Sequence, residues 1–412
     1  MSEPSDAPAR PSPFIALQHR DFRLLWIGQL LSNSGTQMQI VTINWHIYIL
    51  TGSALALGLI GLVRVVPIIV FALAGGLFAD ARDRRHVLLA TQSAMMLFAA
   101  LLAWVTVSGR VNAPIIYLLA ALTAAVGAFD APARQALVPN LVPREQLTNA
   151  LSLNNIMWQV AAIVGPALAG FIIASLGVGA VYWINAASFL AVLVALLLMR
   201  TPAQQNIGMA RVTISALTEG IQFVQQSEVI FATMLLDFFA TFFSSATALL
   251  PIFARDILRV GPEGLGILYA GESVGAVIAG AGLSFAGEIK RQGAVLLIAV
   301  AVYGVATALY GASQWFALSF LFLVLLGFGD TISTILRSTI RQITTPDHLR
   351  GRMTSVNMIF FQGGPQLGEL EAGLVAAAFG APFSVISGGV ATVVLVALTA
   401  WRAPKLREYS GQ

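Results

Sequence analysis

Ionisable side chains lie inside apolar stretches of the sequence, where they can carry protons or bind a charged solute. Counted from the ends of each stretch, Arg64, Asp237 and Glu272 lie nearest the middle. A carboxylate in an apolar surrounding is costly to keep ionised unless it is paired or hydrated, so it takes up a proton more readily than in water. Glu369 and Glu371 point about 200° apart on a helix, and small neighbours favour Glu371. We therefore predict that Arg64, Asp237, Glu272 and Glu371 contribute to proton coupling.

Two further acid–base groups recur at the ends of apolar stretches. Asp130 is followed by Arg134, and Asp330 is followed by Arg337. Their repeated placement is typical of gate elements, which hold one end of a transport path closed by charge. The alternative for every one of these charges is structural, namely a pair that fixes the register of two helices.

Amide and aromatic side chains form a second set of candidates. Asn33, Gln37 and Asn44 recur four and seven residues apart, so one face of a helix carries all three. They can hydrogen-bond a substrate in a cavity, or bond neighbouring helices at about 0.6 kcal/mol each. Trp158 and Phe360 can stack on a bulky substrate, although aromatic residues in membrane helices more often pack or anchor at interfaces.

The sequence lacks the residue patterns of metal sites, nucleotide-binding sites and catalytic triads. There is no cysteine, and the four histidines are scattered without the spacing of a metal site. No phosphate-binding GxxxxGK[ST] segment and no serine–histidine–aspartate arrangement occur. The net charge of +4 is spread over short clusters instead of one basic patch, which argues against nucleic acid as a partner. We therefore expect no metal, no cofactor and no enzymatic activity.

The composition requires a membrane around the elements that carry these residues. Of 412 residues, 57% are hydrophobic and 10% are charged, and the mean hydropathy is +0.81. A soluble fold of this size cannot hide so much apolar surface. About 20 apolar residues form one spanning helix. We predict an all-α membrane protein with twelve transmembrane helices, at 23–50, 53–79, 87–108, 113–135, 149–175, 179–199, 228–254, 263–286, 293–311, 315–338, 352–378 and 382–401.

The basic residues predict the orientation of the chain. Of the 23 lysines and arginines, 18 fall on one side of the predicted spans, and three (Arg110, Arg255 and Arg259) fall on the other. Two more, Arg64 and Arg337, lie inside spans. Cytoplasmic loops carry an excess of basic residues, so both termini are expected in the cytoplasm.

An internal repeat divides the chain into two six-helix halves. Asp130 recurs as Asp330, and Gly165-Pro166 recurs as Gly364-Pro365, at offsets of about 200 residues. The predicted organisation is a cytoplasmic N-terminal tail (1–21), an N-terminal half (22–200), a central cytoplasmic loop (201–227), a C-terminal half (228–402) and a cytoplasmic C-terminal tail (403–412). Transporters that rock around a site at mid-membrane have such repeats.

The loop after the second span resembles the cytoplasmic signature of the major facilitator superfamily. It combines Gly76, Asp80 and the basic pair Arg84 and Arg85, although Ala81 and Asp83 depart from the usual pattern. The resemblance implies that Asp80 pairs with Arg84 or Arg85 and latches the cytoplasmic ends of the helices. Residues 346–352 and 363–368 look like the enterobactin-exporter and macrolide-efflux branch. The segment 165–170 is similar to the antiporter motif of drug exporters, and it makes Gly165, Pro166 and Gly170, with Gly364 and Pro365, helix-packing residues.

This resemblance implies a secondary active transporter of the inner cell membrane. The expected function is proton-coupled efflux of small amphiphilic molecules, of the siderophore or drug class, by alternating access in a monomer. Two alternatives remain open at this point. A lipid or lysophospholipid flippase would have a cavity open to the bilayer, and a non-transporting membrane receptor or scaffold would show no flux.

Overall fold

The computed structural model describes residues 13–81, 83–200, 222–287, 289–346 and 349–411, without the side chains of residues 72–81, 350–352, 354–356, 358–359 and 362. These parts are helical, and no strand occurs among them. The long helices of the N-terminal half are α1 (Arg20–Thr51), α2 (Ala54–Ala81), α3 (Arg84–Val107), α4 (Ala113–Leu137), α5 (Leu147–Leu176) and α6 (Val178–Leu198). Short 3-10 helices lie at Ile15–Gln18, Val138–Asn140 and Arg144–Gln146.

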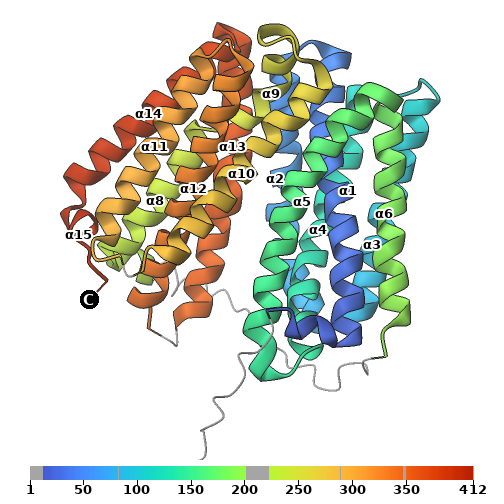
Figure 1. Ribbon diagram of the computed structural model, residues 1–412, viewed down its shortest axis with the longest axis horizontal. Helices are drawn as coiled ribbons and strands as arrows, with labels where there is room; N and C mark the ends of the chain where they lie inside the picture. The colour runs from blue at the N-terminus through green and yellow to red at the C-terminus, as the bar shows by residue number, and fades with distance from the viewer. Residues whose placement is uncertain (1–12, 82, 201–221, 288, 347–348, 412) are drawn as a thin grey trace, which may run out of the picture.

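The C-terminal half repeats this organisation, as the predicted duplication requires. Its elements are α8 (Glu228–Phe243), η4 (Ala246–Leu249), α9 (Leu250–Ile252), η5 (Phe253–Ile257), α10 (Gly261–Phe285), α11 (Gln292–Ala312), α12 (Phe316–Thr344), α13 (Arg350–Phe379), α14 (Ala381–Arg402) and α15 (Pro404–Arg407). Figure 1 shows the two halves side by side, with α1 to α6 in one bundle and α8 to α15 in the other.

Ten segments of the described chain are long and apolar enough to cross a membrane. Helices α1 and α13 occupy the predicted spans 23–50 and 352–378 but are not among the ten. Both are long enough. Each carries many polar side chains, such as the amides of α1 and the two glutamates of α13, which lower its hydropathy. The number of twelve spans therefore stays a prediction, whereas the all-helical membrane fold is confirmed.

The two ends of the bundle differ in chemistry. Arg20, Arg84 and Arg402 lie at the end where α1 begins and α14 ends, and we call this the basic end. Short turns at the opposite end connect α1 to α2, α5 to α6 and α13 to α14. Gly52 and Gly380 hold φ values of 60° and 92° in these turns, a region that favours glycine. The basic end lies at the bottom of Figure 1.

The predicted seventh span is broken instead of continuous. Helix α8 ends at Phe243, and a 3-10 turn and a wide π turn follow before Ile257. The hydroxyl groups of Thr241 and Ser245 bond to carbonyls one turn earlier, at 2.8 Å each, which competes with regular helix bonding. Non-helical backbone at membrane depth is tolerated where it lines a polar cavity.

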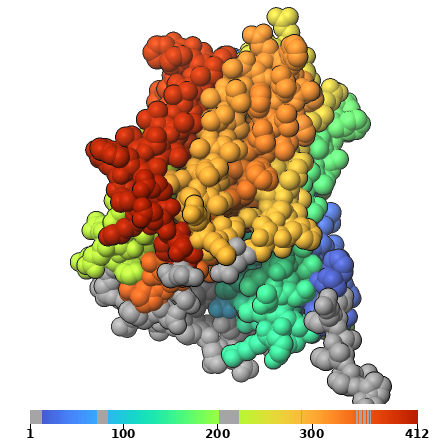
Figure 2. All heavy atoms as spheres, turned by 60° about the vertical axis from the view of Figure 1, so that its left-hand side comes forward, coloured from blue at the N-terminus to red at the C-terminus, as the bar shows by residue number. Residues whose placement is uncertain are grey.

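The two halves touch through pairs of glycines. Gly170 of α5 packs on Gly266 of α10, and a Cβ on Gly170 would lie 3.1 Å from the Gly266 Cα. Gly58 of α2 packs on Gly373 of α13 in the same way, with a Cβ on Gly58 only 2.9 Å from the Gly373 Cα. Figure 2 shows α10 in contact with α5 on one face of the molecule. The absence of side chains lets the helix backbones approach.

The predicted packing motifs lie at such close approaches. Gly165 faces α1, where its Cβ would meet the Ser34 carbonyl oxygen at 2.8 Å. Gly364 faces Phe238 of α8, and the Pro365 carbonyl accepts a hydrogen bond from Ser245 at 3.1 Å. The Pro166 carbonyl borders Gly266. Each motif therefore places backbone against a neighbouring helix.

Candidate functional site

A cavity of about 490 Å³ lies between the two halves. It is lined by residues of α5, α10, α12 and α13 that lie from the middle of these helices toward the basic end. Trp158 and Phe361 are 44% and 51% exposed, so the cavity is accessible. The lining residues are Asn155, Trp158, Gln159, Glu272, Ser273, Ala276, Gly327, Asp330, Thr331, Thr334, Ile335 and Phe361.

The opposite end of the molecule is closed. A hydrophobic cluster there joins Trp45 of α1, Ile173 of α5, Phe253 of η5 and Leu268 of α10. Hydrogen bonds between the halves add to it. Asn44 donates to the Tyr269 hydroxyl at 2.8 Å, and the Tyr48 hydroxyl donates to Asp256. Within the described residues, the cavity between the halves therefore lies on the basic-end side of these contacts.

Close packing of α10 on α12 brings two carboxylates together on the cavity wall. A Cβ at Gly327 of α12 would meet the backbone of Glu272 at distances shorter than any real contact. Asp330 lies one turn after Gly327 on the same face of α12, so it lies close to Glu272 at the contact between α10 and α12. Both side chains border the cavity, and Asp330 acts electrostatically on Glu272. Tyr303 of α11 lies within reach of both charges.

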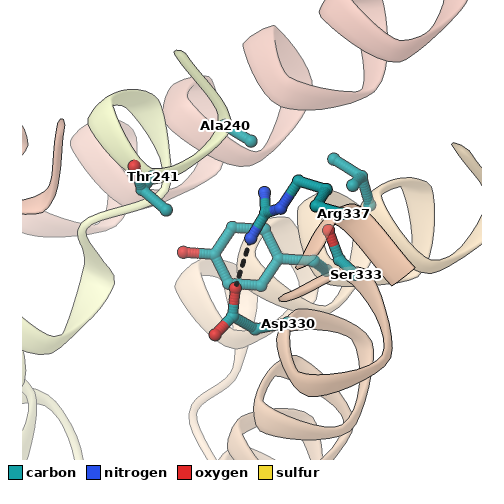
Figure 3. Close-up of a pocket in the computed structure, with 7 residues that line it drawn as sticks. Ala240, Thr241, Asp330, Ser333 and Arg337 are labelled. Carbon is teal, nitrogen blue, oxygen red and sulfur yellow. Dashed lines mark ion pairs between the residues drawn. The ribbon is translucent and has the colours of Figure 1, made fainter. Parts of the chain in front are cut away.

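Behind this wall, Arg337 holds a buried ion pair. Its Nη1 atom lies 2.7 Å from the Asp237 Oδ1 atom of α8, and the two side chains are 3% and 2% exposed. The same guanidinium places Nη2 at 3.9 Å from Asp330 Oδ1, whereas the Asp330 side chain is 37% exposed. Figure 3 shows this second contact as a dashed line. Thr334 accepts a hydrogen bond from Nη2 at 2.9 Å.

A small void adjoins Arg337, and part of its lining lacks hydrogen-bond partners. Asp330, Ser333 and Arg337 border it together with Ala240, Thr241, Val300 and Tyr303. Within the described residues, Ser333 Oγ, Arg337 Nε and Asp237 Oδ2 are buried and without a partner. A second void, of about 120 Å³, runs from Asp330 and Glu272 to the hydroxyls of the α8 break. The void beside Arg337 has no room for a water molecule, whereas the second one is large enough for water to bond the polar groups that line it.

The N-terminal half contains a related network in which the carboxylate has several partners. Asp130 is 0% exposed. It forms an ion pair with Arg134 and accepts hydrogen bonds from Thr91 at 2.8 Å and Gln92 at 2.7 Å. Arg134 also donates to the Asn33 amide oxygen at 3.3 Å. No cavity-facing carboxylate remains here among the described residues, in contrast to the C-terminal half.

The repeat therefore places similar residues with different partners. Asp130 and Asp330 occupy equivalent positions, and Asn33 of α1 corresponds to Asp237 of α8 at an offset close to that of the repeat. The charged Asp237 draws Arg337 toward α8, so Asp330 keeps a longer contact. Asp330 thus faces the cavity with an incomplete partner, whereas Asp130 is enclosed.

The structure separates the four residues predicted to carry protons. Asp237 is held by Arg337, and Glu272 lies on the cavity wall. Arg64 of α2 acts electrostatically on Glu369 of α13, so the glutamate that the helical angle disfavoured lies nearer a cation. Glu371 is partly buried, and no hydrogen bond or ion pair involves it within the described chain. None of these placements tests a role in coupling.

Of the residues predicted to bind substrate, some line the cavity and others contact neighbouring helices. Asn33 and Asn44 are each 6% exposed and bond other helices. Gln37 packs against Gly165. Trp158 borders the cavity, with the Arg134 guanidinium 5.7 Å from its ring centroid. Phe360 packs edge-on against Phe238 at 6.0 Å, and its neighbour Phe361 lines the cavity instead.

The basic residues of the predicted latch bind within their own half. Arg84 donates to the Ala136 carbonyl at 2.6 Å, and Arg85 donates to the Leu197 carbonyl at 3.1 Å. These carbonyls lie at the ends of α4 and α6, where a cation is favoured by the helix dipole. The side chains of Gly76 and Asp80 fall outside the described residues, so the expected latch stays a prediction.

Sequence patterns did not single out several cavity residues. Asn155, Gln159, Thr331, Thr334 and Phe361 are uncharged, and polar or aromatic residues of this kind are common in membrane helices. A helical signal does exist. Asn155, Trp158 and Gln159 share a face by their three- and four-residue spacing, as do Asp330 and Thr334. Only the packed structure shows that these faces meet.

A family model described as transmembrane secretion effector matches residues 11–411. Among curated relatives, the multidrug efflux pump Tap of Mycolicibacterium fortuitum is 27% identical over 399 residues, with 93% of this chain and 96% of the relative covered. The staphyloferrin A transporter of Staphylococcus aureus is 26% identical, and the match covers 90% of each chain. The enterobactin exporter EntS of Salmonella choleraesuis is 25% identical, with 82% and 81% covered.

Solved transporter structures have the same fold. An inward-facing, unoccupied bacterial homologue of the human lysosomal transporter Spinster superposes with a TM-score of 0.72 at 14% identity, over 97% of this chain and 99% of that one. A bacterial homologue of ferroportin, also inward-facing, gives 0.67 at 16% identity, over 93% and 99%. The family match over nearly the whole length, together with this fold, shows that the chain belongs to the transmembrane secretion effector family, a group of major facilitator superfamily transporters in the efflux branch rather than enzymes.

Proposed function

We propose that this transporter exports small amphiphilic molecules of the drug or siderophore class in exchange for protons. The observation that carries the proposal is the cavity between the halves, with Glu272 and Asp330 on its wall. Relatives named as a multidrug efflux pump and as an enterobactin exporter support an exporter. The transporter would act as a monomer in the inner membrane, with both termini in the cytoplasm.

In this proposal the structure represents the inward-facing state. The basic end is the cytoplasmic end, because basic residues are enriched on the cytoplasmic side of membrane proteins. The cavity then opens to the cytoplasm, where a substrate enters. Asn44–Tyr269 and Tyr48–Asp256 close the external end, and both contacts must separate when the transporter turns outward. The glycine contacts between the halves lie toward the same end, so they must separate as well.

Protons would be carried by the carboxylates that face the cavity. Glu272 and Asp330 lie side by side without an intervening cation among the described residues, so protonation of one removes the repulsion between them. Asp237 is less suited, because its ion pair with Arg337 is almost completely buried. The ionisable groups around the two acids are Asp237, Arg337 and Arg341 on the α8 and α12 side, with Tyr303 on α11 and Tyr269 on α10.

Purified protein in liposomes tests this function. A fluorescent amphiphilic dye, such as ethidium, is loaded on the cytoplasmic side, and a proton gradient that drives protons toward that side is imposed. We expect export at least several-fold faster than without the gradient. Glu272→Gln and Asp330→Asn should each remove the stimulation by the gradient. Export that is unchanged by the gradient would refute the coupling.

A matched control comes from the same helix. Glu263 lies in the first turn of α10, exposed at the external end. Glu263→Gln makes the same chemical change as Glu272→Gln, and it should leave the response to the gradient intact. Glu371→Gln and Asp237→Asn extend the test to the other predicted carboxylates. If only Glu371→Gln removes the stimulation, the proton site lies on α13 and the assignment to the cavity wall is wrong.

A further inference from the structure

The charges that line the cavity have one sign. Among its described lining residues, Glu272 and Asp330 are the ionisable side chains, and no lysine, arginine or histidine is present. The nearest guanidinium groups do not line the cavity. Arg337 lies behind the wall, where it pairs with Asp237 at 2.7 Å and reaches Asp330 only at 3.9 Å, and Arg134 pairs with Asp130 inside the N-terminal half. Among the described lining residues, a solute therefore meets Glu272 with no cation beside it and Asp330 with one long ion-pair contact.

Aromatic surface is present beside the acids. Trp158 and Phe361 border the same cavity and are among its most exposed apolar side chains, at 44% and 51%. Aromatic faces attract organic cations, because the face of the ring carries negative potential. The Arg134 guanidinium near Trp158 shows that this ring already accepts a cation in the structure, at 5.7 Å from the centroid.

An unpartnered polar group adjoins the acids as well. Ser333 is 1% exposed, its Oγ atom has no hydrogen-bond partner in the described chain, and it lines the void beside Asp330. Figure 3 shows Ser333 and Asp330 at the same void. Ser333 thus adds an unbonded polar group to the surroundings of Asp330.

The balance of charge in the C-terminal half points the same way. Its described intramembrane groups around the cavity are Asp237, Glu272, Asp330, Arg337 and Arg341, and Arg341 interacts with both Arg337 and Asp237. Three acids face two guanidinium groups, so the fully ionised cluster lacks one positive charge. One proton or one monovalent organic cation supplies it. An anionic solute would increase the imbalance.

From these observations we infer that the cavity is selective for organic cations with an aromatic or bulky apolar body, bound at Glu272 and Asp330 in place of a proton. The inference rests on the proposed export function and gives its substrate class. It excludes anionic siderophores as ligands of this cavity. Substrate and proton then compete for the same two carboxylates, which couples their movements without a separate proton site.

Binding of xanthene dyes tests the selectivity for charge. Rhodamine 6G is cationic and fluorescein is anionic, although they share a ring system of similar size. Fluorescence anisotropy with the purified protein in detergent, corrected for protein-free micelles, gives both affinities. We expect rhodamine 6G to bind at least tenfold more tightly than fluorescein. Equal binding, or tighter binding of fluorescein, would overturn the inference, and this comparison needs no variant.

Variants locate the binding site. Glu272→Gln and Asp330→Asn should each weaken binding of rhodamine 6G by about tenfold or more, since one ionic partner corresponds to about 1.4 kcal/mol or more in this range. Glu263→Gln, the matched change on the same helix, should have no effect. Lowering the pH should release the dye from wild-type protein and change little in the double variant. Unchanged affinity in a folded double variant would refute the site.

The outcomes separate this inference from the proposed function. If the dye binds with the expected charge preference but a proton gradient does not drive export, coupling fails and the substrate class stands. If export responds to the gradient but the cavity binds both dyes equally, the function stands and the selectivity fails.

Discussion

The Asp237–Arg337 pair predicts an unequal response to the removal of its two members. Asp237→Asn takes away one partner of Arg337, but Arg337 also lies 3.9 Å from Asp330. Arg337→Gln instead removes the guanidinium that lies 2.7 Å from Asp237, and it leaves this carboxylate buried, with 2% of its side chain exposed. We therefore expect Arg337→Gln to destabilise the protein much more than Asp237→Asn.

The distances give the size of the difference. Coulomb attraction falls with distance, so Asp330 at its present position offers about two-thirds of the attraction that Asp237 offers. Removing one member of a buried pair costs about 3–5 kcal/mol when the other is left without compensation. Arg337→Gln should cost that much. Asp237→Asn should cost about 1–2 kcal/mol, because the guanidinium turns toward Asp330 and keeps a partner.

Reversible unfolding by sodium dodecyl sulfate, followed by tryptophan fluorescence, measures both free energies. The double variant Asp237→Asn/Arg337→Gln completes the cycle and should be more stable than Arg337→Gln alone, since it leaves no buried carboxylate unpaired. If Arg337→Gln does not fold, the double variant should still do so. An Asp237→Asn variant as unstable as Arg337→Gln would refute the sharing of Arg337 between two acids.

Two further predictions concern the pseudo-symmetry and the contacts between the halves. Asp130→Asn should lower the free energy of unfolding by about 3 kcal/mol, because the carboxylate is 0% exposed and has three partners. Asp330→Asn should change the free energy of unfolding by less than about 1 kcal/mol, since its side chain is 37% exposed. The same SDS titration measures both, and equal losses would contradict the assigned environments. Gly266→Val should force α5 away from α10, where a Cβ already meets the Gly170 Cα at 3.1 Å, and so favour opening of the external end. A cysteine in place of Ser273, in a chain without native cysteine, should then react faster with a membrane-impermeant maleimide added outside, and unchanged labelling would count against a role for this contact in closure.

The fold was predictable from the sequence because lipid imposes simple rules on composition. Apolar stretches of sufficient length, basic loops and the recurrence of Asp130 as Asp330 together indicate the helical bundle and its two halves. The break after Phe243 was not predictable in the same way. The segment around the break is apolar enough, despite its serines and threonines, to be read as part of one span. The hydrogen bonds from these hydroxyl groups to earlier carbonyls are visible only in the folded chain.

The contacts between residues of the candidate site were less predictable from the sequence than the fold. Helical spacing shows that Asn33, Gln37 and Asn44 share a face, but not that this face packs on other helices instead of lining the cavity. Asp237 and Arg337 were both recognised as intramembrane charges. Their pairing joins positions 100 residues apart in the sequence, and one sequence does not reveal such a contact. The same limit applies to Glu272 and Asp330.

The glycine contacts between the halves have a mechanical consequence. Gly58 against Gly373 and Gly170 against Gly266 put bare backbone on bare backbone, so no side chain interlocks across either contact. The two helix pairs can therefore separate at these points without any change of side-chain rotamer. A side chain added at either contact would hold the two backbones apart, which is the effect expected of Gly266→Val.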